Sequence, residues 1–361
     1  MINIYSHLLG YFDILFSYIA PYINSFYNYS WFWDGLGDIY KINLLCNKYI
    51  KYLNNESYDN FLKINKLNII WYKEEYLSEN IKINYGKFLS PFHESLKDNS
   101  KYVFIAFVYN IHNWTIKNNK IISLNSNKIF IDFPATGIIN YNKTFSYVKL
   151  LTQNNIGVFL ITPLYYGDRT VLYHNKLHFI NNIANYQLQT LTIIFEGLLL
   201  VDYLWNINNK FKIACGGISW GGSIAACVSL ISKIPLRTIT YMGGSSPRVM
   251  ILGAIKTEIN KNLLNNINIS NLVNIFENGI TYYKLQTKSF INNKNIHKIT
   301  QISCKNDYYV NYNESILFSK LLYNSIDNKK NYKLKWINGG HFTGFLLKNK
   351  IYVNYIIDLL N

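Results

Sequence analysis

The sequence has few cysteines for its 361 residues, and it contains no nucleotide-binding signature. The four cysteines, Cys46, Cys215, Cys227 and Cys304, form no CxxC pair. This excludes a disulfide scaffold and indicates buried thiols in a reducing, intracellular compartment. Neither GxxxxGK[ST] nor GxGxxG occurs, so we expect no nucleotide cofactor.

A complete set of metal ligands is also lacking. His174 and His178 stand four residues apart, as two zinc ligands on one helix do. The glutamate of an HExxH motif is absent, however, and no third ligand is evident. We therefore expect structural or surface histidines here, and no metal site.

Positive charge is absent from the amino-terminal segment. No lysine or arginine precedes Lys41, whereas residues 8–33 are rich in aromatic and aliphatic side chains. A signal peptide needs a basic start and a mitochondrial presequence needs arginines, so the segment carries neither address. Asp13 and Pro21 interrupt the apolar run, which favours an interfacial or core-packed helix over a membrane span. We expect residues 1–66 to form a helical, aromatic-rich extension with peripheral membrane contact.

Negative charge is scarce, since 36 basic residues face 20 acidic ones and give a formal charge of +16. Such an excess would suit nucleic acid or an acidic membrane surface. Arginine occurs only as Arg169, Arg237 and Arg248, and the chain is rich in Asn, Lys, Ile and Tyr. Codon bias therefore explains much of the charge better than a selected polyanion site does. With no zinc finger and no basic helix, no nucleic-acid partner is expected.

Apolar material is abundant at 49% of residues, and it is arranged in short runs. The predicted strands are Asn68–Tyr72, Ile81–Phe88, Tyr102–Val108, Lys128–Phe133, Gly157–Thr162, Lys212–Gly216, Arg237–Met242, Lys298–Cys304 and Tyr332–Ile337. The first three are too close together for crossover helices and should pair antiparallel. From the fourth onward, helical lengths separate the runs, which predicts a mostly parallel sheet with helices on both faces.

Two helical stretches have a special place in this pattern. Tyr186–Trp205 is apolar almost all round but lies between two strands and carries Glu196 and Asp202, which favours a buried crossover helix over a membrane span. Residues 250–290 lack a strand signal and suit a helical lid. We therefore expect one α/β domain over residues 67–361, with this lid inserted.

A glycine-bracketed serine follows one of the predicted strands. Gly217-Ile-Ser219-Trp-Gly221 fits G-x-S-x-G between a strand and small, helix-forming residues. Such a serine adopts strained backbone angles, and Gly217 and Gly221 are needed because side chains there would collide with the crossing strand and helix. The pattern predicts an α/β-hydrolase fold with Ser219 as nucleophile, and with the Trp220 N–H as one oxyanion donor.

A serine nucleophile needs a base, and the base needs a carboxylate to orient it. Two histidines follow Ser219. His341 comes after a strand through Asn-Gly-Gly, whereas His297 lies in a Lys- and Asn-rich segment entering a strand, so His341 is the better candidate. Asp307 follows the strand that ends at Cys304 and is favoured as the acid over Glu314 in the next helix.

The loop Phe133-Pro-Ala-Thr-Gly137 follows the fourth predicted strand, where a second oxyanion donor belongs. The N–H groups of Ala135 and Thr136 are the candidates. An ordinary Pro-Gly turn remains an equal alternative.

Several segments together resemble the α/β-hydrolase domain-containing protein 18 family. The matching segments are Gly86–Pro91, Ala135–Gly137, Pro163–Gly167 with Arg169, Gly217–Gly222, Lys305–Asp307, and Gly339–His341 with Phe345–Lys348, in the family order over about residues 28–358. Three features depart from the family pattern. Trp220 stands where Met is usual, Ser223 stands where His is usual, and one extra residue separates Pro163 from Tyr165.

The resemblance implies a serine hydrolase acting on lipid acyl esters, with a mitochondrial phospholipid such as cardiolipin as the expected substrate. Arg169, near Tyr166 at a strand end, would then contact a phosphate, or it would simply pair with Asp168. Acyl transfer on the same residues is the nearest alternative. A catalytically idle hydrolase fold that binds lipid or serves as a scaffold is the other, and Trp220 keeps it open.

Overall fold

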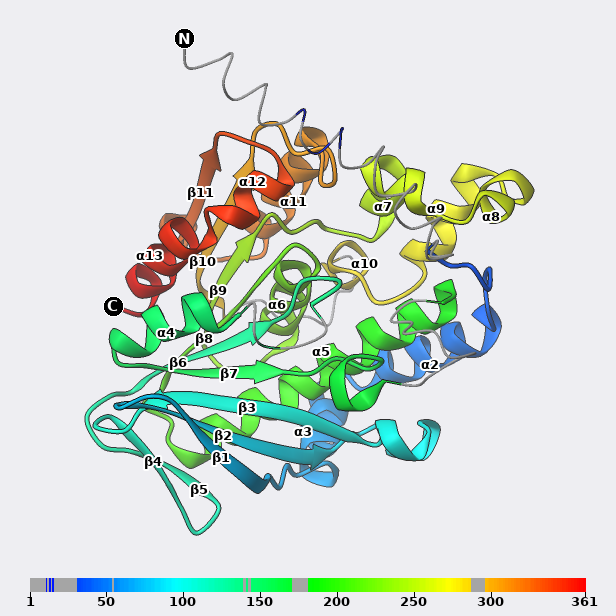
Figure 1. Ribbon diagram of the computed structural model, residues 1–361. Helices are drawn as coiled ribbons and strands as arrows, with labels where there is room; N and C mark the ends of the chain where they lie inside the picture. The colour runs from blue at the N-terminus through cyan, green and yellow to red at the C-terminus, as the bar shows by residue number, and fades with distance from the viewer. Residues whose placement is uncertain are drawn as a thin grey trace.

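The computed structural model describes residues 31–53, 55–138, 144–170, 181–286 and 296–361, together with Tyr11, Asp13, Leu15 and Tyr141. Within these residues, nine strands form one twisted sheet in the order β1-β2-β3-β7-β6-β8-β9-β10-β11 (Figure 1). Their bounds are β1 Ile70–Ser78, β2 Ile81–Leu89, β3 Tyr102–Asn110, β6 Lys128–Phe133, β7 Ile156–Ile161, β8 Lys212–Ile218, β9 Leu236–Tyr241, β10 Ile296–Cys304 and β11 Tyr332–Ile337.

Strand direction divides this sheet into two parts. The pairs β1–β2, β2–β3 and β3–β7 are antiparallel. All remaining neighbours, from β7 through β6, β8, β9 and β10 to β11, run parallel. The prediction of a mostly parallel sheet with antiparallel amino-terminal strands is therefore confirmed. Because parallel strands end at the same edge, the loops after β6, β8, β10 and β11 meet there.

Helices cover both faces of the sheet, as predicted. Strand β7 is buried at every position, as expected for a parallel strand with both faces covered. One face is covered by α4 and α13, and the other by α5 and α6, with α2 packed on α5. The bounds are α2 Ile39–Lys51, α3 Asn55–Ile64, α4 Phe145–Gln153, α5 Ile183–Ile207, α6 Trp220–Ile231, α11 Tyr312–Asn324, α12 His341–Leu346 and α13 Lys348–Leu360.

Helix α5 is the one helix of the described residues that is long and apolar enough to cross a membrane. In the fold it connects β7 to β8, and 72% of its most apolar window is buried inside the protein. Apolar residues on every side are what a helix enclosed by protein requires. The crossover helix predicted for Tyr186–Trp205 is thus found at Ile183–Ile207.

The helices α2 and α3 belong to the same core as α5. Tyr49 of α2 stacks on Phe92 with ring centroids 4.2 Å apart. It also meets Phe195 of α5 edge-on at 5.2 Å, as does Phe61 of α3. Aromatic pairs in these geometries stabilise beyond the area they bury. The domain boundary at residue 66 stays a prediction, but the aromatic residues of these two helices help to build the hydrolase core.

Short helices fill the stretch predicted as a lid, as far as Gln286. They are α7 Arg248–Leu252, α8 Lys261–Asn266, α9 Ile269–Glu277 and α10 Tyr282–Gln286. Residues 287–290 lie outside the described residues. In Figure 1 α10 lies beside α6, and α7, α8 and α9 lie further out, beyond the carboxyl ends of the parallel strands.

Candidate active site

The turn between β8 and α6 holds Ser219 in an unusual backbone conformation. Its φ of 56° and ψ of −122° lie outside the regions that L-residues favour. Such a residue costs of order 1–3 kcal/mol and persists only where its surroundings fix it. Here the Ser219 N–H donates to the carbonyl of Tyr241 on the neighbouring strand at 2.7 Å. The turn therefore presents the serine at the amino end of α6, where strand and helix cross.

Two glycines make this crossing possible. A Cβ at Gly221 would lie 2.0 Å from the carbonyl oxygen of Phe133, and one at Gly217 would lie 2.4 Å from the carbonyl carbon of Gly221. Neither distance is open to a real side chain, and both obstacles are backbone. The bracket of glycines thus lets β6, β8 and α6 approach one another around Ser219.

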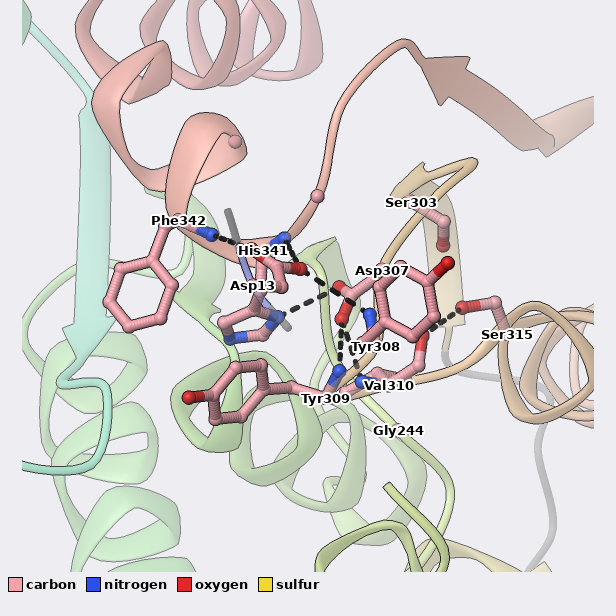
Figure 2. Close-up of polar contacts among 12 residues, drawn as sticks. Asp13, Gly244, Ser303, Asp307, Tyr308, Tyr309, Val310, Ser315, His341 and Phe342 are labelled. Carbon is pink, nitrogen blue, oxygen red and sulfur yellow. Dashed lines mark hydrogen bonds and ion pairs between the residues drawn. The ribbon is translucent and has the colours of Figure 1, made fainter. Parts of the chain in front are cut away.

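Asp307 and His341 meet at the same edge of the sheet, from the loops after β10 and β11. His341 Nδ1 lies 2.7 Å from Asp307 Oδ2 (Figure 2). The other oxygen, Oδ1, accepts hydrogen bonds from the N–H groups of Tyr309 and Val310, both at 2.8 Å. Asp307 is 5% exposed, so backbone donors and the imidazole together compensate its buried charge.

A second carboxylate, Asp13, lies beside this pair (Figure 2). Its oxygens accept hydrogen bonds from the N–H groups of Tyr308, His341 and Phe342. One signal in the sequence could have indicated Asp13, because it is an acidic residue within an apolar run. Its partners, however, lie about 300 positions further along the chain, where no local pattern predicts a contact.

A cavity opens beside Ser219 and extends under the short helices. Thr136, Ser219 and Trp220 line it at one end, and Val249, Met250, Ile255, Ile280 and Tyr282 line it from the segment predicted as a lid. None of the described residues that line this cavity is charged. Such a wall binds apolar, uncharged groups.

Comparison with known proteins identifies the family of this fold. A model of the family described as alpha/beta hydrolase domain containing 18 matches residues 30–278, more than half of the chain. The chain belongs to this family. No curated protein sequence matches the chain. The match of the family model confirms the resemblance that the sequence motifs indicated.

Solved structures support the same fold. An acetyl xylan esterase from Paenibacillus sp. R4 is 11% identical, with a TM-score of 0.55 over 84% of this chain and 92% of that one. An acylaminoacyl peptidase from Pyrococcus horikoshii is 12% identical, with a TM-score of 0.50 over 77% of this chain and 42% of that one. At these identities the likeness concerns the fold alone.

The match to the alpha/beta hydrolase domain containing 18 family includes Ser219 but ends before Asp307 and His341. The pairing of these two residues consequently rests on the geometry of this chain. The alternatives weighed from the sequence lie elsewhere. His297 is at the start of β10, at the opposite end of the strand from Asp307, and Glu314 binds Arg248 at 2.9 Å.

Arg169 has a different environment from the one expected. Both of its terminal nitrogens bind Glu196, at 2.9 and 2.8 Å, and they also donate to the carbonyls of Thr162 and Ser100. Its side chain and that of Glu196 are fully buried. The pair with Asp168 is therefore not formed, and a substrate phosphate could not reach Arg169, which is not among the residues that line the cavity. A buried guanidinium needs a buried carboxylate, and Glu196 supplies it.

Tyr166 supports the loop that carries the oxyanion candidates. It is 1% exposed, and its hydroxyl accepts a hydrogen bond from the Gly137 N–H at 3.0 Å. Thr136 lines the cavity beside Ser219, whereas Ala135 is 7% exposed and is not among the lining residues. Tyr166 does not line the cavity either, so its position does not support the predicted direct contact with the substrate.

The structure places no cluster of metal ligands in the described ranges, where no three His, Cys, Asp or Glu side chains are grouped suitably. His174 and His178 lie outside the described residues.

Two opposing effects act on the pKa of His341. Burial lowers the pKa of the imidazole, but the carboxylates of Asp307 and Asp13 outweigh it, so the pKa is raised above its ordinary value.

Proposed function

We propose that this α/β hydrolase cleaves acyl esters through a covalent acyl-enzyme on Ser219. The observation that carries the proposal is the strained serine at the head of α6. It lines an uncharged cavity, at the sheet edge where Asp307 and His341 form a hydrogen-bonded pair. A nucleophile, an oriented base and a substrate cavity at one edge of a parallel sheet are the parts that serine hydrolysis requires.

In this mechanism the Ser219 Oγ attacks the ester carbonyl carbon while His341 takes its proton. Asp307 holds the imidazole through Nδ1 and stabilises the imidazolium that forms. The oxyanion is received by the N–H groups of Trp220 and of Thr136 or Ala135. The carbon–oxygen bond to the alcohol then breaks, and the alcohol leaves with the proton from His341. Water repeats the sequence on the acyl-enzyme and releases the acid and the free Ser219.

We propose a membrane lipid, such as a phospholipid or cardiolipin, as the source of the ester, on the strength of the family resemblance. The uncharged lining of the cavity is compatible with an acyl chain. The cavity is narrow, at about 60 Å³, against roughly 300–1,000 Å³ for pockets that enclose larger ligands. A long chain therefore requires the helices between residues 248 and 286 to move apart. Membrane association and a mitochondrial location are part of the same proposal.

Labelling with a fluorophosphonate probe tests the nucleophile. We expect the full-length protein to be labelled and Ser219→Ala to lose both labelling and ester hydrolysis, because no other hydroxyl is placed at the strained turn. Ser229→Ala is the matched control. Ser229 lies on the same helix, is buried and does not line the cavity, so this variant should react like the parent. Unlabelled parent protein that is folded would overturn the proposal in favour of an idle scaffold.

The substrate is tested by measuring acid released from nitrophenyl esters of increasing chain length, and from vesicles of phosphatidylcholine with and without cardiolipin. Faster release from vesicles than from short esters supports a lipid substrate. Activity confined to acetyl or butyryl esters would contradict it. An added alcohol that collects the acyl group in preference to water would identify a transferase instead.

A further inference from the structure

Asp13 connects the two loops that carry Asp307 and His341. Its Oδ2 accepts the N–H of Tyr308 at 3.3 Å and the N–H of His341 at 2.5 Å. Its Oδ1 accepts the N–H of Phe342 at 3.0 Å. One carboxylate thus binds the residue that follows Asp307 and the backbone of His341 itself (Figure 2). This connection is separate from the side-chain bond between Asp307 and His341.

The fit around Asp13 is close. The side chain is fully buried, and a Cβ at Gly340 would lie 2.4 Å from Oδ2. The loop before His341 can therefore approach the carboxylate only because glycine stands at that position. Burying a charge without partners costs several kcal/mol, so three backbone donors at this point are a substantial compensation.

Within the described part of the chain, His341 is the one group facing this carboxylate that can carry a positive charge. The titratable groups that face Asp13 are His341, Asp307, Tyr309 and Cys304. Among the described residues, no lysine or arginine forms an ion pair with it. Burial raises the pKa of Asp13, and its three backbone donors include two that lower it again. When ionised, the carboxylate favours the protonated form of His341 together with Asp307.

We infer that Asp13 is a positioning residue of the proposed Ser219 site, holding the His341 loop against the Asp307 loop. The inference rests on the proposed function, since it concerns the same imidazole. Asp13 bonds only backbone N–H groups, so it acts through His341 and Asp307 and not on the substrate. The proposed site would then need Asp13, a residue of the predicted amino-terminal extension.

The test is Asp13→Asn in the full chain, assayed on nitrophenyl butyrate across pH 5 to 9. The amide keeps the size of the side chain but lacks the charge, and its NH2 group opposes one backbone donor. In metal sites, losing an outer partner that orients a ligand costs about 10- to 100-fold in metal affinity or activity. By the same reasoning we expect the kcat of Asp13→Asn to fall by roughly that factor, with KM within about twofold. Asp38→Asn is the matched control, because Asp38 caps α2 through the Lys41 N–H and should leave both parameters unchanged.

The pH profile separates positioning from a merely structural role. Neutral His341 is the active base, so activity falls as pH drops through its pKa. Asp13 raises that pKa, so its loss should move the acidic limb to lower pH. Gly340→Ala provides a second variant, which displaces the carboxylate without removing its charge. It should lower kcat but move the acidic limb less than Asp13→Asn does, because the charge stays near His341.

The outcomes distinguish the two claims. If Asp13→Asn keeps the parent kcat and acidic limb while Ser219→Ala is inactive, the inference is overturned and the proposed function stands. The same holds if only the melting temperature falls and activity per folded molecule is unchanged. If Asp13→Asn does not fold, the kcat of Gly340→Ala decides: a lowered kcat supports the inference, and the parent kcat overturns it. An active Ser219→Ala variant would remove the proposed function, and the inference with it.

Discussion

Two buried groups of charged side chains in the described part of the protein differ in how completely their charges are paired. In the first group, Arg169 and Glu196 form a bidentate pair, and Ser90 donates to the same carboxylate at 2.7 Å. In the second, two carboxylates lie close to His341: Asp307 bonds its imidazole, and Asp13 accepts its backbone N–H. The first group is electrically balanced within the core. The second carries an excess of negative charge and lies at the sheet edge beside the cavity.

This difference separates a structural role from a chemical one. A balanced pair with fixed charges has one stable state, and removing either partner leaves an isolated charge in the core. His341, whose pKa the two nearby carboxylates raise, is instead a group that can take up and release a proton. Burial alone therefore does not identify a site. A buried group that can exchange a proton and lies next to a cavity is a much better indicator of a functional site.

The largest effect is expected from breaking the second group at Asp307. Asp307→Asn removes the carboxylate that orients His341, and replacing such an aspartate by asparagine in a serine hydrolase lowers kcat by about 10⁴-fold. Hydrolysis of nitrophenyl butyrate measures the loss, with circular dichroism to verify the fold. Asp327→Asn, at an exposed position, is the control and should keep full activity. A loss below tenfold would mean that another carboxylate orients His341.

Breaking the first group should affect stability and not chemistry. Arg169→Met leaves the Glu196 carboxylate buried without its cation, which typically costs about 3–5 kcal/mol of the free energy of unfolding. Urea denaturation measures this cost. Adding Glu196→Leu to the same chain should recover most of it, whereas Arg237→Met on the half-buried face of β9 should cost much less. An Arg169→Met protein with parent stability but reduced kcat would reverse the assignment of the two groups.

The smallest effect on activity is expected at Tyr166, which contacts both the oxyanion loop and Arg169 of the first group. Tyr166 accepts from the Gly137 N–H, and its own carbonyl accepts from the Arg169 N–H at 2.9 Å. Tyr166→Phe removes one hydrogen bond of the oxyanion loop, worth about 0.5–1.5 kcal/mol, so kcat should fall by about two- to tenfold. Steady-state kinetics on the same ester measure it, and Tyr203→Phe on α5 serves as the control. Unchanged kcat would show that this loop takes no part in the reaction.

Much of the sheet could be predicted because its strands are short apolar runs separated by helical lengths. One hairpin is missing from the predicted strands. It consists of β4 Trp114–Lys117 and β5 Lys120–Ser123. Its two-residue turn, Asn118-Asn119, has φ values of 51° and 59°. Asparagine tolerates this left-handed conformation, so the pair of asparagines between alternating residues was a usable signal. Strands of four residues are simply too short for a clear alternating pattern.

The candidate site was only partly accessible from the sequence. Ser219, Asp307 and His341 could be singled out because each follows a predicted strand, and strand ends meet at one edge. Asp13 follows no predicted strand, and its contacts join it to loops about 300 residues away. The partner of Arg169 was misjudged for a related reason. Asp168 is adjacent in sequence, but only Glu196 on α5 points into the same buried space.

The contact between Asp13 and His341 joins positions 328 residues apart, and this has a consequence for how the protein is made. Chains are synthesised from the amino end, and contacts between distant segments form late because they must close long loops. The sheet from β1 to β9 and the Ser219 turn can assemble while the rest of the chain is still being translated. The His341 loop joins Asp13 only afterwards. A nascent chain would therefore carry a formed serine turn without its base, and would stay chemically silent until synthesis is nearly finished.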